Sequence, residues 1–204
     1  MAVPQATAWP LVRPHGEGLI RAYMIVQTHR LPILLFGPSG SGKSSLGRHL
    51  ATKGWIHLEA DLFREERKDG IDEHGLRATW DAFIDQHQPF HLARELEQRR
   101  AKPNALGIVL TLPSLVVPPP NLIVASKGLL SIKILFGSLT HCLGAFLERE
   151  QKTTDGLGRG HWEQHNRLIF AKLIEPPFQA YIVQGFHPSG ERRQLAEIAD
   201  DTLR

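Results

Sequence analysis

The chain has 204 residues, of which 42% are hydrophobic and 22% are charged, so it is long enough for one soluble globular domain with a substantial core. Its formal net charge of +3 suits anionic small molecules and is too small to indicate a nucleic-acid-binding protein. The single cysteine, Cys142, excludes an internal disulfide, and because no apolar run approaches the roughly 18 residues that span a membrane, we expect a cytoplasmic protein.

Residues 1–30 are expected to form a loose lead-in, within which residues 19–28 predict either an extra edge strand or a short helix. Residues 31–204 are expected to form one domain. Five apolar segments in it predict buried strands, at 31–36, 55–61, 107–114, 132–136 and 179–184. Helices are predicted at 43–53, over most of 72–100 with a break at Pro89, and at 121–130, 139–149, 161–174 and 189–203, the last with Ser189 as N-cap. Strands that alternate with helices predict an α/β fold with a parallel sheet.

The first predicted strand leads directly into Gly-Pro-Ser-Gly-Ser-Gly-Lys-Ser at 37–44, which has the Gly-x-x-x-x-Gly-Lys-Ser pattern of a P-loop. The glycines permit positive φ and close approach, so that consecutive N–H groups can point at a phosphate. Lys43 is expected to reach the terminal phosphates, and the Ser44 hydroxyl is expected to bind Mg²⁺. The predicted nucleotide-binding residues are Gly37, Ser39, Gly40, Ser41, Gly42, Lys43, Ser44 and Ser45.

Asp61 closes the second predicted strand. Because only one helix separates this strand from the first, the two are expected to be parallel, which brings Asp61 out at the carboxyl edge of the sheet beside the P-loop. A catalytic role is favoured there, and a helix N-cap is the alternative. Glu59 shares the strand parity of Asp61 and is a candidate for a residue that supports the metal indirectly, through a group that binds the ion, although a surface or capping role is favoured for it.

Other classes of P-loop protein fit the chain less well. A RecA-like or motor ATPase would carry an acid at the end of a buried strand, but the third and fourth predicted strands end in Leu-Thr-Leu-Pro at 110–113 and Leu-Phe-Gly at 135–137. A GTPase would need Asp-x-x-Gly after the third strand and Asn-Lys-x-Asp later. Asp-Gly-Leu-Gly at 155–158 fits the first pattern by its letters, but it follows the fourth strand and is interpreted as a flexible loop, and the second pattern is absent.

The stretch 37–45, followed after one helix by Ile-His-Leu-Glu-Ala-Asp-Leu-Phe-Arg at 56–64, resembles the gluconate kinase, shikimate kinase and adenylylsulfate kinase group. The order of later elements is also similar, so the resemblance covers about residues 31–204. It implies a three-layer α/β/α P-loop NTPase fold with a five-stranded parallel sheet in the order 2-3-1-4-5. It also implies a lid at about 149–167.

By position, the resemblance implies that Asp61 orients the acceptor hydroxyl or takes its proton, and that Arg64 contacts an anionic part of the acceptor. Lys43 and the lid residues Arg149 and Arg159 would stabilise charge on the transferred phosphoryl group, with ATP and Mg²⁺ as cofactors. A solvated charged face is an equal alternative for the lid arginines. The chain departs from the group at 111–120, where an apolar, proline-rich segment suits a less polar acceptor, or none.

The sequence therefore predicts an ATP- and Mg²⁺-dependent phosphotransferase that acts on a hydroxyl of a small molecule. The alternative is a nucleotide-binding regulatory or accessory ATPase without such an acceptor. A kinase that acts on a nucleotide or a nucleic-acid end is a weaker alternative. The acceptor, the nucleobase and the oligomeric state stay open at this point.

Overall fold

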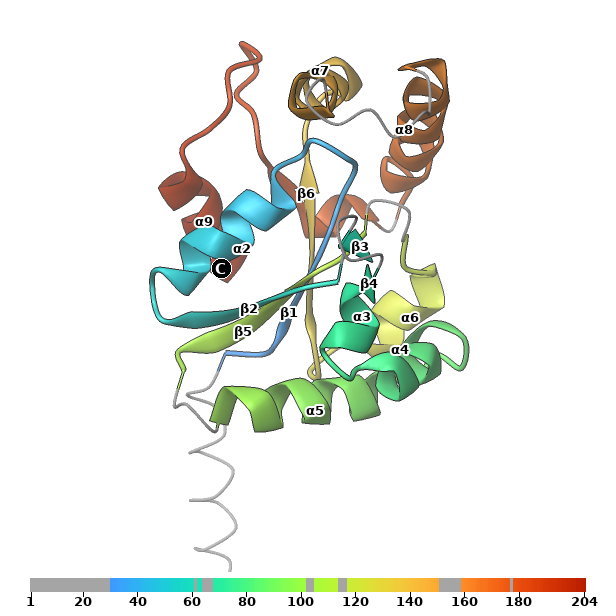
Figure 1. Ribbon diagram of the computed structural model, residues 1–204, viewed down its shortest axis with the longest axis vertical. Helices are drawn as coiled ribbons and strands as arrows, with labels where there is room; N and C mark the ends of the chain where they lie inside the picture. Colours follow the sequence, from blue (N-terminus) through green and yellow to red (C-terminus); the bar gives the residue numbers. More distant parts are fainter. Residues whose placement is uncertain are drawn as a thin grey trace, which may run out of the picture. The chain divides into compact units, whose positions relative to one another are not determined.

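The computed structural model describes residues 30–60, 62–63, 68–101, 105–113, 117–150, 159–176 and 178–204. Residues 31–204 form one compact unit. Five parallel strands make its main sheet (Figure 1): β1 (Ile33–Phe36), β2 (Trp55–Glu59), β5 (Gly107–Thr111), β6 (Ser131–Phe136) and β7 (Ile182–Gln184). Their order is β2-β5-β1-β6-β7, which confirms the order 2-3-1-4-5 that the resemblance implied.

β1 is the central strand, and all four of its residues are buried. It pairs in parallel with β5 on one side and β6 on the other, with Leu34 opposite Leu110 and Ile132. Successive side chains of a strand point to opposite faces, so Leu34 belongs to one hydrophobic core and Leu35 to the other. A strand that is covered on both faces must be apolar throughout, which is why this segment reads as a continuous aliphatic run.

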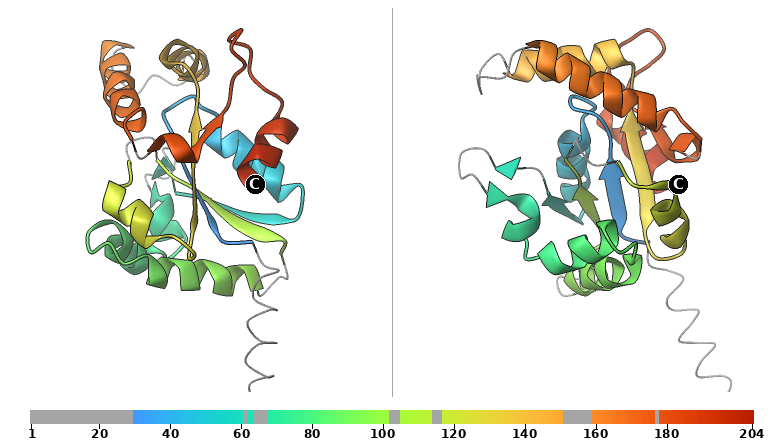
Figure 2. Two further views of the ribbon diagram at one scale, coloured as in Figure 1. Left: turned by 180° about the vertical axis from the view of Figure 1, so that it is seen from behind. Right: turned by 90° about the vertical axis from the view of Figure 1, so that its right-hand side faces the viewer.

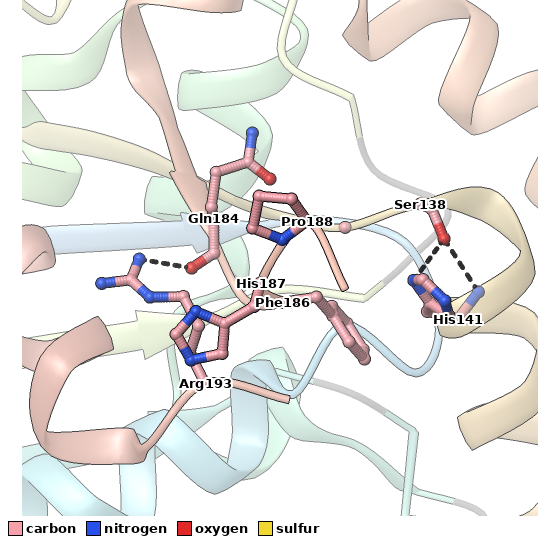
Figure 3. A pocket seen from close by; sticks show the side chains of 8 residues that line it. Ser138, His141, Gln184, Phe186, His187, Pro188 and Arg193 are labelled. Atoms are coloured by element: carbon pink, nitrogen blue, oxygen red, sulfur yellow. Dashed lines mark hydrogen bonds between the residues drawn. The ribbon is translucent and has the colours of Figure 1, made fainter. Parts of the chain in front are cut away.

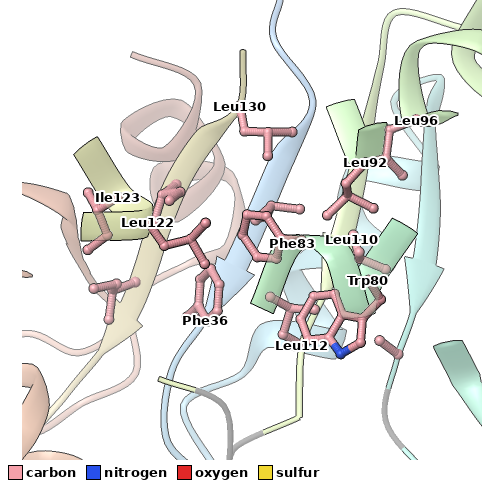
Figure 4. Close-up of a cluster of buried hydrophobic side chains, with 14 of the residues drawn as sticks. Phe36, Trp80, Phe83, Leu92, Leu96, Leu110, Leu112, Leu122, Ile123 and Leu130 are labelled. Carbon is pink, nitrogen blue, oxygen red and sulfur yellow. The ribbon is translucent and has the colours of Figure 1, made fainter. Parts of the chain in front are cut away.

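Helices cover both faces of the sheet. One face packs against α2 (Lys43–Ala51) and α9 (Leu195–Leu203), as Figures 1 and 2 show. The other packs against α4 (Arg77–Ile84), α5 (Pro89–Ala101), α6 (Pro120–Ala125) and the 3₁₀ helix η1 (Phe178–Tyr181). In this second core Trp80 and Phe83 of α4 lie against the leucines of α5 and of the sheet (Figure 4). The ring centroids of Trp80 and Phe83 are 5.6 Å apart. Within the described residues, no helix is long and apolar enough to cross a membrane.

Two further helices lie beyond the carboxyl ends of the strands, α7 (Leu139–Glu150) and α8 (Arg159–Leu173), as Figure 2 shows. Cys142 of α7 is fully buried. Ile169 and Leu173 bring the end of α8 into the larger core. The loop 37–42, between β1 and α2, lies at this same end of the sheet (Figure 1).

Some predicted elements were wrong. The sequence predicted no strand between the second and third strands of the main sheet, but a small antiparallel sheet of β3 (Leu62–Phe63) and β4 (Lys68–Asp69) lies there, followed by α3 (Gly70–Glu73). The predicted strand 179–184 is a 3₁₀ turn up to residue 181 and a strand only afterwards.

The predicted N-cap at Ser189 was also wrong, because α9 begins at Leu195. Residues 186–192 form a hairpin instead, in which Phe186 and Arg192 make an antiparallel bridge. The His187 N–H donates to the Glu191 carbonyl at 2.8 Å and closes the hairpin. The proline, serine and glycine at 188–190 are turn-forming residues, and here they make a turn between two short extended segments rather than a helix start.

Candidate functional site

The loop 37–42 rests directly on the backbone of α7. Gly40 has a φ of 76°, and a Cβ on it would lie 1.9 Å from the carbonyl oxygen of Cys142 and 2.9 Å from the backbone nitrogen of Phe146. Only glycine combines this backbone conformation with the space that remains. Gly40 is therefore needed for two reasons: it allows the positive φ of the loop, and it leaves room for the backbone of α7.

Lys43 is the first residue of α2, and its ammonium lies against the loop rather than in solvent. Its Nζ donates to the carbonyls of Gly37 at 2.8 Å and Pro38 at 3.1 Å, and the residue is 8% exposed. A buried ammonium is costly unless its donors are paired, and these two carbonyls supply partners. The positive charge is thereby fixed beside the N-terminus of α2, where the helix dipole also favours an anion.

A buried hydroxyl inside the loop supports a ligand there. Ser41 is 1% exposed, and within the described part of the chain its Oγ has no hydrogen-bond partner. The same oxygen lies 3.1 Å from the position of a Cβ on Gly37, the first residue of the loop. A buried hydroxyl without a hydrogen bond costs about 1–3 kcal/mol of free energy. A ligand with a polar atom that hydrogen-bonds to it would remove this cost, which favours binding.

Ser44 follows Lys43 on α2, and its hydroxyl donates to the carboxylate of Glu59, the last residue of β2. This contact joins Glu59 to the residue that the sequence predicted to bind Mg²⁺, as the metal-supporting role considered for it would require, and that role stays a prediction. Arg48 lies one turn further along α2, with its Nη1 3.9 Å from the other oxygen of the same carboxylate. His74 contacts the backbone of Glu59 instead, with Nε2 3.1 Å from the carbonyl oxygen. The carboxylate is thus directed at the start of α2.

His57 lies two residues before Glu59 on the same face of β2. Its Nε2 is 2.9 Å from the Oγ1 of Thr111, which lies at the end of β5. Burial lowers the pKa of His57 below its ordinary value, and the nearby Glu59 carboxylate offsets part of that effect. The imidazole is therefore neutral near pH 7, and the charges beside Ser44 are those of Glu59 and Arg48.

A pocket of 570 Å³ lies beside the loop, where the start of α7 meets the hairpin 186–192 (Figure 3). Its lining residues are Gly137, Ser138, His141, Gln184, Phe186, His187, Pro188 and Arg193. The rings of Phe186 and His141 are stacked, with centroids 5.4 Å apart and planes inclined by 24°. The pocket therefore combines an aromatic surface with hydroxyl, amide and imidazole groups.

The sequence-predicted site residues divide into three groups. Lys43, Ser44 and the loop lie together, as expected. Asp61 and Arg64 fall outside the described residues, so their roles stay predictions. Arg149 lies near the end of α7 and Arg159 is the first residue of α8, and their side chains also lie outside the described part.

Sequence reasoning missed one contact of the loop altogether. Arg192, in the hairpin, donates from Nη2 to the carbonyl of Gly40 at 3.0 Å. The two residues are 152 positions apart, and no motif around Arg192 marks it. Only the prediction that the last strand ends at the same sheet edge as the loop could have suggested such a contact.

No protein-family model matches the chain, and no curated protein matches it significantly. Among solved structures, it is similar to a gluconokinase from Sinorhizobium meliloti 1021, at 21% identity over 84% of this chain and 89% of that one, with a TM-score of 0.46. It is also similar to a shikimate kinase from Acinetobacter baumannii in complex with shikimate, at 18% identity over 88% and 94% of the two chains, with a TM-score of 0.48. A third neighbour is a deoxyadenosine kinase from M. mycoides with bound dATP, at 12% identity over 83% and 96%, with a TM-score of 0.41.

Proposed function

We propose that the protein is an ATP- and Mg²⁺-dependent phosphotransferase that moves the γ-phosphoryl group to a hydroxyl of a small molecule. The observation that carries the proposal is the placement of Lys43 and Ser44 on the first turn of α2. The ammonium is held on the loop by carbonyls at 2.8 and 3.1 Å, and the adjacent hydroxyl donates to Glu59. A cation and a metal-binding oxygen are thereby directed to the same loop, as phosphoryl transfer requires.

The residues beside Ser44 fit a magnesium ion. Mg²⁺ prefers oxygen ligands and is bound in such sites by one or two protein oxygens together with phosphate oxygens. Ser44 and Glu59 supply a hydroxyl and a carboxylate that already contact each other. These two residues would hold the ion, which neutralises charge on the phosphates when bound.

The phosphate chain would lie in the loop 37–42, within reach of the Lys43 ammonium and of the Ser41 hydroxyl, which has no hydrogen-bond partner among the described residues. We assign the nucleobase to the pocket between α7 and the hairpin 186–192. Its volume of 570 Å³ is within the range of small-molecule sites, about 300–1,000 Å³. Phe186 lines one side of it, and Ser138 and Gln184 offer polar groups (Figure 3).

For the acceptor side we propose the roles that the sequence predicted. The Ala60 N–H donates to the Thr111 carbonyl at 2.9 Å, which fixes the chain to the carboxyl edge of the sheet up to the residue before Asp61. Asp61 would orient the acceptor hydroxyl or accept its proton, and Arg64 would contact an anionic group of the acceptor. Arg149 and Arg159, on the helices that flank residues 151–158, would stabilise the transferred phosphoryl group.

The test begins with a thermal-shift screen of nucleotides and hydroxylated metabolites, since a ligand that binds only the folded protein raises its stability. ATP consumption is then measured with and without each acceptor found. Asp61→Asn should reduce the acceptor-dependent rate by about 100-fold or more, while Asp85→Asn, a matched exposed carboxylate at the end of α4, should not. ATP binding that depends on Lys43, with no acceptor and no effect of Asp61→Asn, would support a regulatory nucleotide-binding protein instead.

A further inference from the structure

Arg192 contacts the loop 37–42 from the far end of the chain. Its Nη2 donates to the Gly40 carbonyl at 3.0 Å, and its Nη1 lies 2.4 Å from the position of a Cβ on Gly42. The edge of the guanidinium that carries Nη1 and Nη2 therefore faces the backbone of residues 40–42. It is the hairpin 186–192, which follows the last strand, that places it there.

The Arg192 guanidinium contacts the Phe186 ring with its face and the Gly40 carbonyl with its edge. Its Cζ lies 4.9 Å from the centroid of the Phe186 ring, which is the geometry of a cation–π contact. Phe186 is itself fixed, because it stacks on His141 and because a Cβ on Gly137 would lie 2.3 Å from its ring. A planar guanidinium can stack on a ring and donate in its own plane at the same time, which a lysine ammonium cannot do.

The Gly40 carbonyl differs from three other carbonyls of the loop, those of Gly37, Pro38 and Gly42, in where its partner comes from. In a loop whose N–H groups turn toward an anion, carbonyls turn outward and must be paired elsewhere. The carbonyls of Gly37, Pro38 and Gly42 accept hydrogen bonds from within the loop and α2. The Gly40 carbonyl accepts its hydrogen bond from Arg192, so the orientation of peptide 40–41 depends on a side chain from outside this segment.

We propose that Arg192 is a positioning residue for the phosphate-binding loop. It fixes the orientation of peptide 40–41 and thereby the binding of the phosphate chain, whatever base is attached to that chain. This inference rests on the proposed function, because it assumes that the loop 37–42 binds phosphate. It goes beyond that function by assigning the hairpin a role in the phosphate subsite.

The test compares a nucleotide with a ligand that has no base. Dissociation constants of ATP and of inorganic tripolyphosphate, both with Mg²⁺, are measured by calorimetry for the wild type, Arg192→Met and Arg192→Lys. Arg192→Met should weaken both ligands by the same factor, about ten-fold, which is the typical effect of losing a charged hydrogen bond. Arg192→Lys should resemble Arg192→Met, because charge alone does not restore the stacked geometry. The control is Arg99→Met, which removes an arginine paired with Glu95 on α5 at 3.0 Å and should change neither constant.

Several results would overturn the inference. If Arg192→Met weakened the binding of ATP but not of tripolyphosphate, Arg192 would act on the base. If Arg192→Lys had the dissociation constants of the wild type, only the charge of the side chain would matter. If ligand-free Arg192→Met has a lower melting temperature than the wild type, its weaker binding could reflect a less stable fold. Phe186→Leu is then measured as well, because it keeps the guanidinium and removes the ring on which the guanidinium stacks. That variant should weaken tripolyphosphate binding, though less than Arg192→Met does, and an unchanged tripolyphosphate constant would contradict us; this arm uses the base-free ligand alone because Phe186 also lines the pocket assigned to the base. A wild type that binds neither ligand overturns the proposed function itself, before any variant is compared.

Discussion

The close contact between α2 and β2 can be tested at Gly47, in the middle of α2. A Cβ on Gly47 would lie 2.3 Å from His57 Nε2, and 2.5 and 2.7 Å from two other atoms of the same ring. The ring has little freedom to move away, because its Nε2 is 2.9 Å from the Oγ1 of Thr111, a fully buried residue. Gly47→Ala therefore adds a methyl group to a space that the imidazole already fills.

The sign of the effect follows from three magnitudes. In an open helix, Gly→Ala stabilises a protein by about 1 kcal/mol. Overpacking costs about 1–3 kcal/mol, and displacing the His57 ring from Thr111 costs a further 0.5–1.5 kcal/mol, roughly. Gly47→Ala should therefore lower the free energy of unfolding by about 0.5–3.5 kcal/mol. In a His57→Ala background the same change should raise it by about 1 kcal/mol, because the obstacle is gone.

Urea unfolding of the wild type, both single variants and the double variant gives the interaction free energy between Gly47 and His57. The matched control is Gly144→Ala in α7, where a Cβ would have no atom of the described residues within 4 Å, so this change should stabilise the protein. If Gly47→Ala stabilised the protein as Gly144→Ala does, the steric argument would be refuted. A destabilisation that persisted without the His57 ring would show that another neighbour is responsible.

Three further predictions concern the site. Glu59→Gln should raise the Mg²⁺ concentration needed for half-maximal ATP binding about ten-fold, with metal-free binding unchanged, in a magnesium titration. Gly40→Ala should abolish ATP binding in calorimetry and lower the melting temperature, since its Cβ would lie 1.9 Å from the Cys142 carbonyl oxygen and backbone cannot move aside as a side chain can. The free energy of unfolding should fall as the pH drops below 6.5, because the lowered pKa of His57 keeps it neutral in the folded protein while the unfolded chain takes up the proton. Urea unfolding at about pH 7.5 and about pH 5.5 checks this, and His57→Gln should make the fall smaller.

The fold could be predicted because its determinants are local. A continuous aliphatic run predicts a strand covered on both faces, and β1 is such a strand, buried at every residue. The glycine pattern at 37–42 and the helix that follows it are likewise set by neighbouring residues. The same local reasoning explains the error at Ser189, since a serine before an acidic, apolar segment suits an N-cap and a turn equally well. Only the pairing of Phe186 with Arg192 decides between the two.

The candidate site could be predicted only in part, because its contacts join distant segments. The parity of β2 places Glu59 on a face but does not say what lies opposite. The rotation of α2 about its own axis brings Ser44 to that carboxylate, and this rotation is set by packing rather than by propensity. Arg192 depends on a hairpin that itself was not predicted. Such contacts depend on the tertiary structure and produce no recognisable pattern of residue spacing in the sequence.

The position of Glu59 can be traced to a residue that the P-loop motif does not require. Ser44 and Gly47 are three residues apart on α2 and so lie on one face of that helix, while His57 and Glu59 are two apart on one face of β2. The two elements therefore meet in two neighbouring pairs, Gly47 with His57 and Ser44 with Glu59. A side chain at the first pair would hold the helix away from the strand, and the second pair could not then form its hydrogen bond. Gly47→Ala should accordingly weaken Mg²⁺-dependent ATP binding although Gly47 touches no ligand, and Gly144→Ala should leave that binding unchanged.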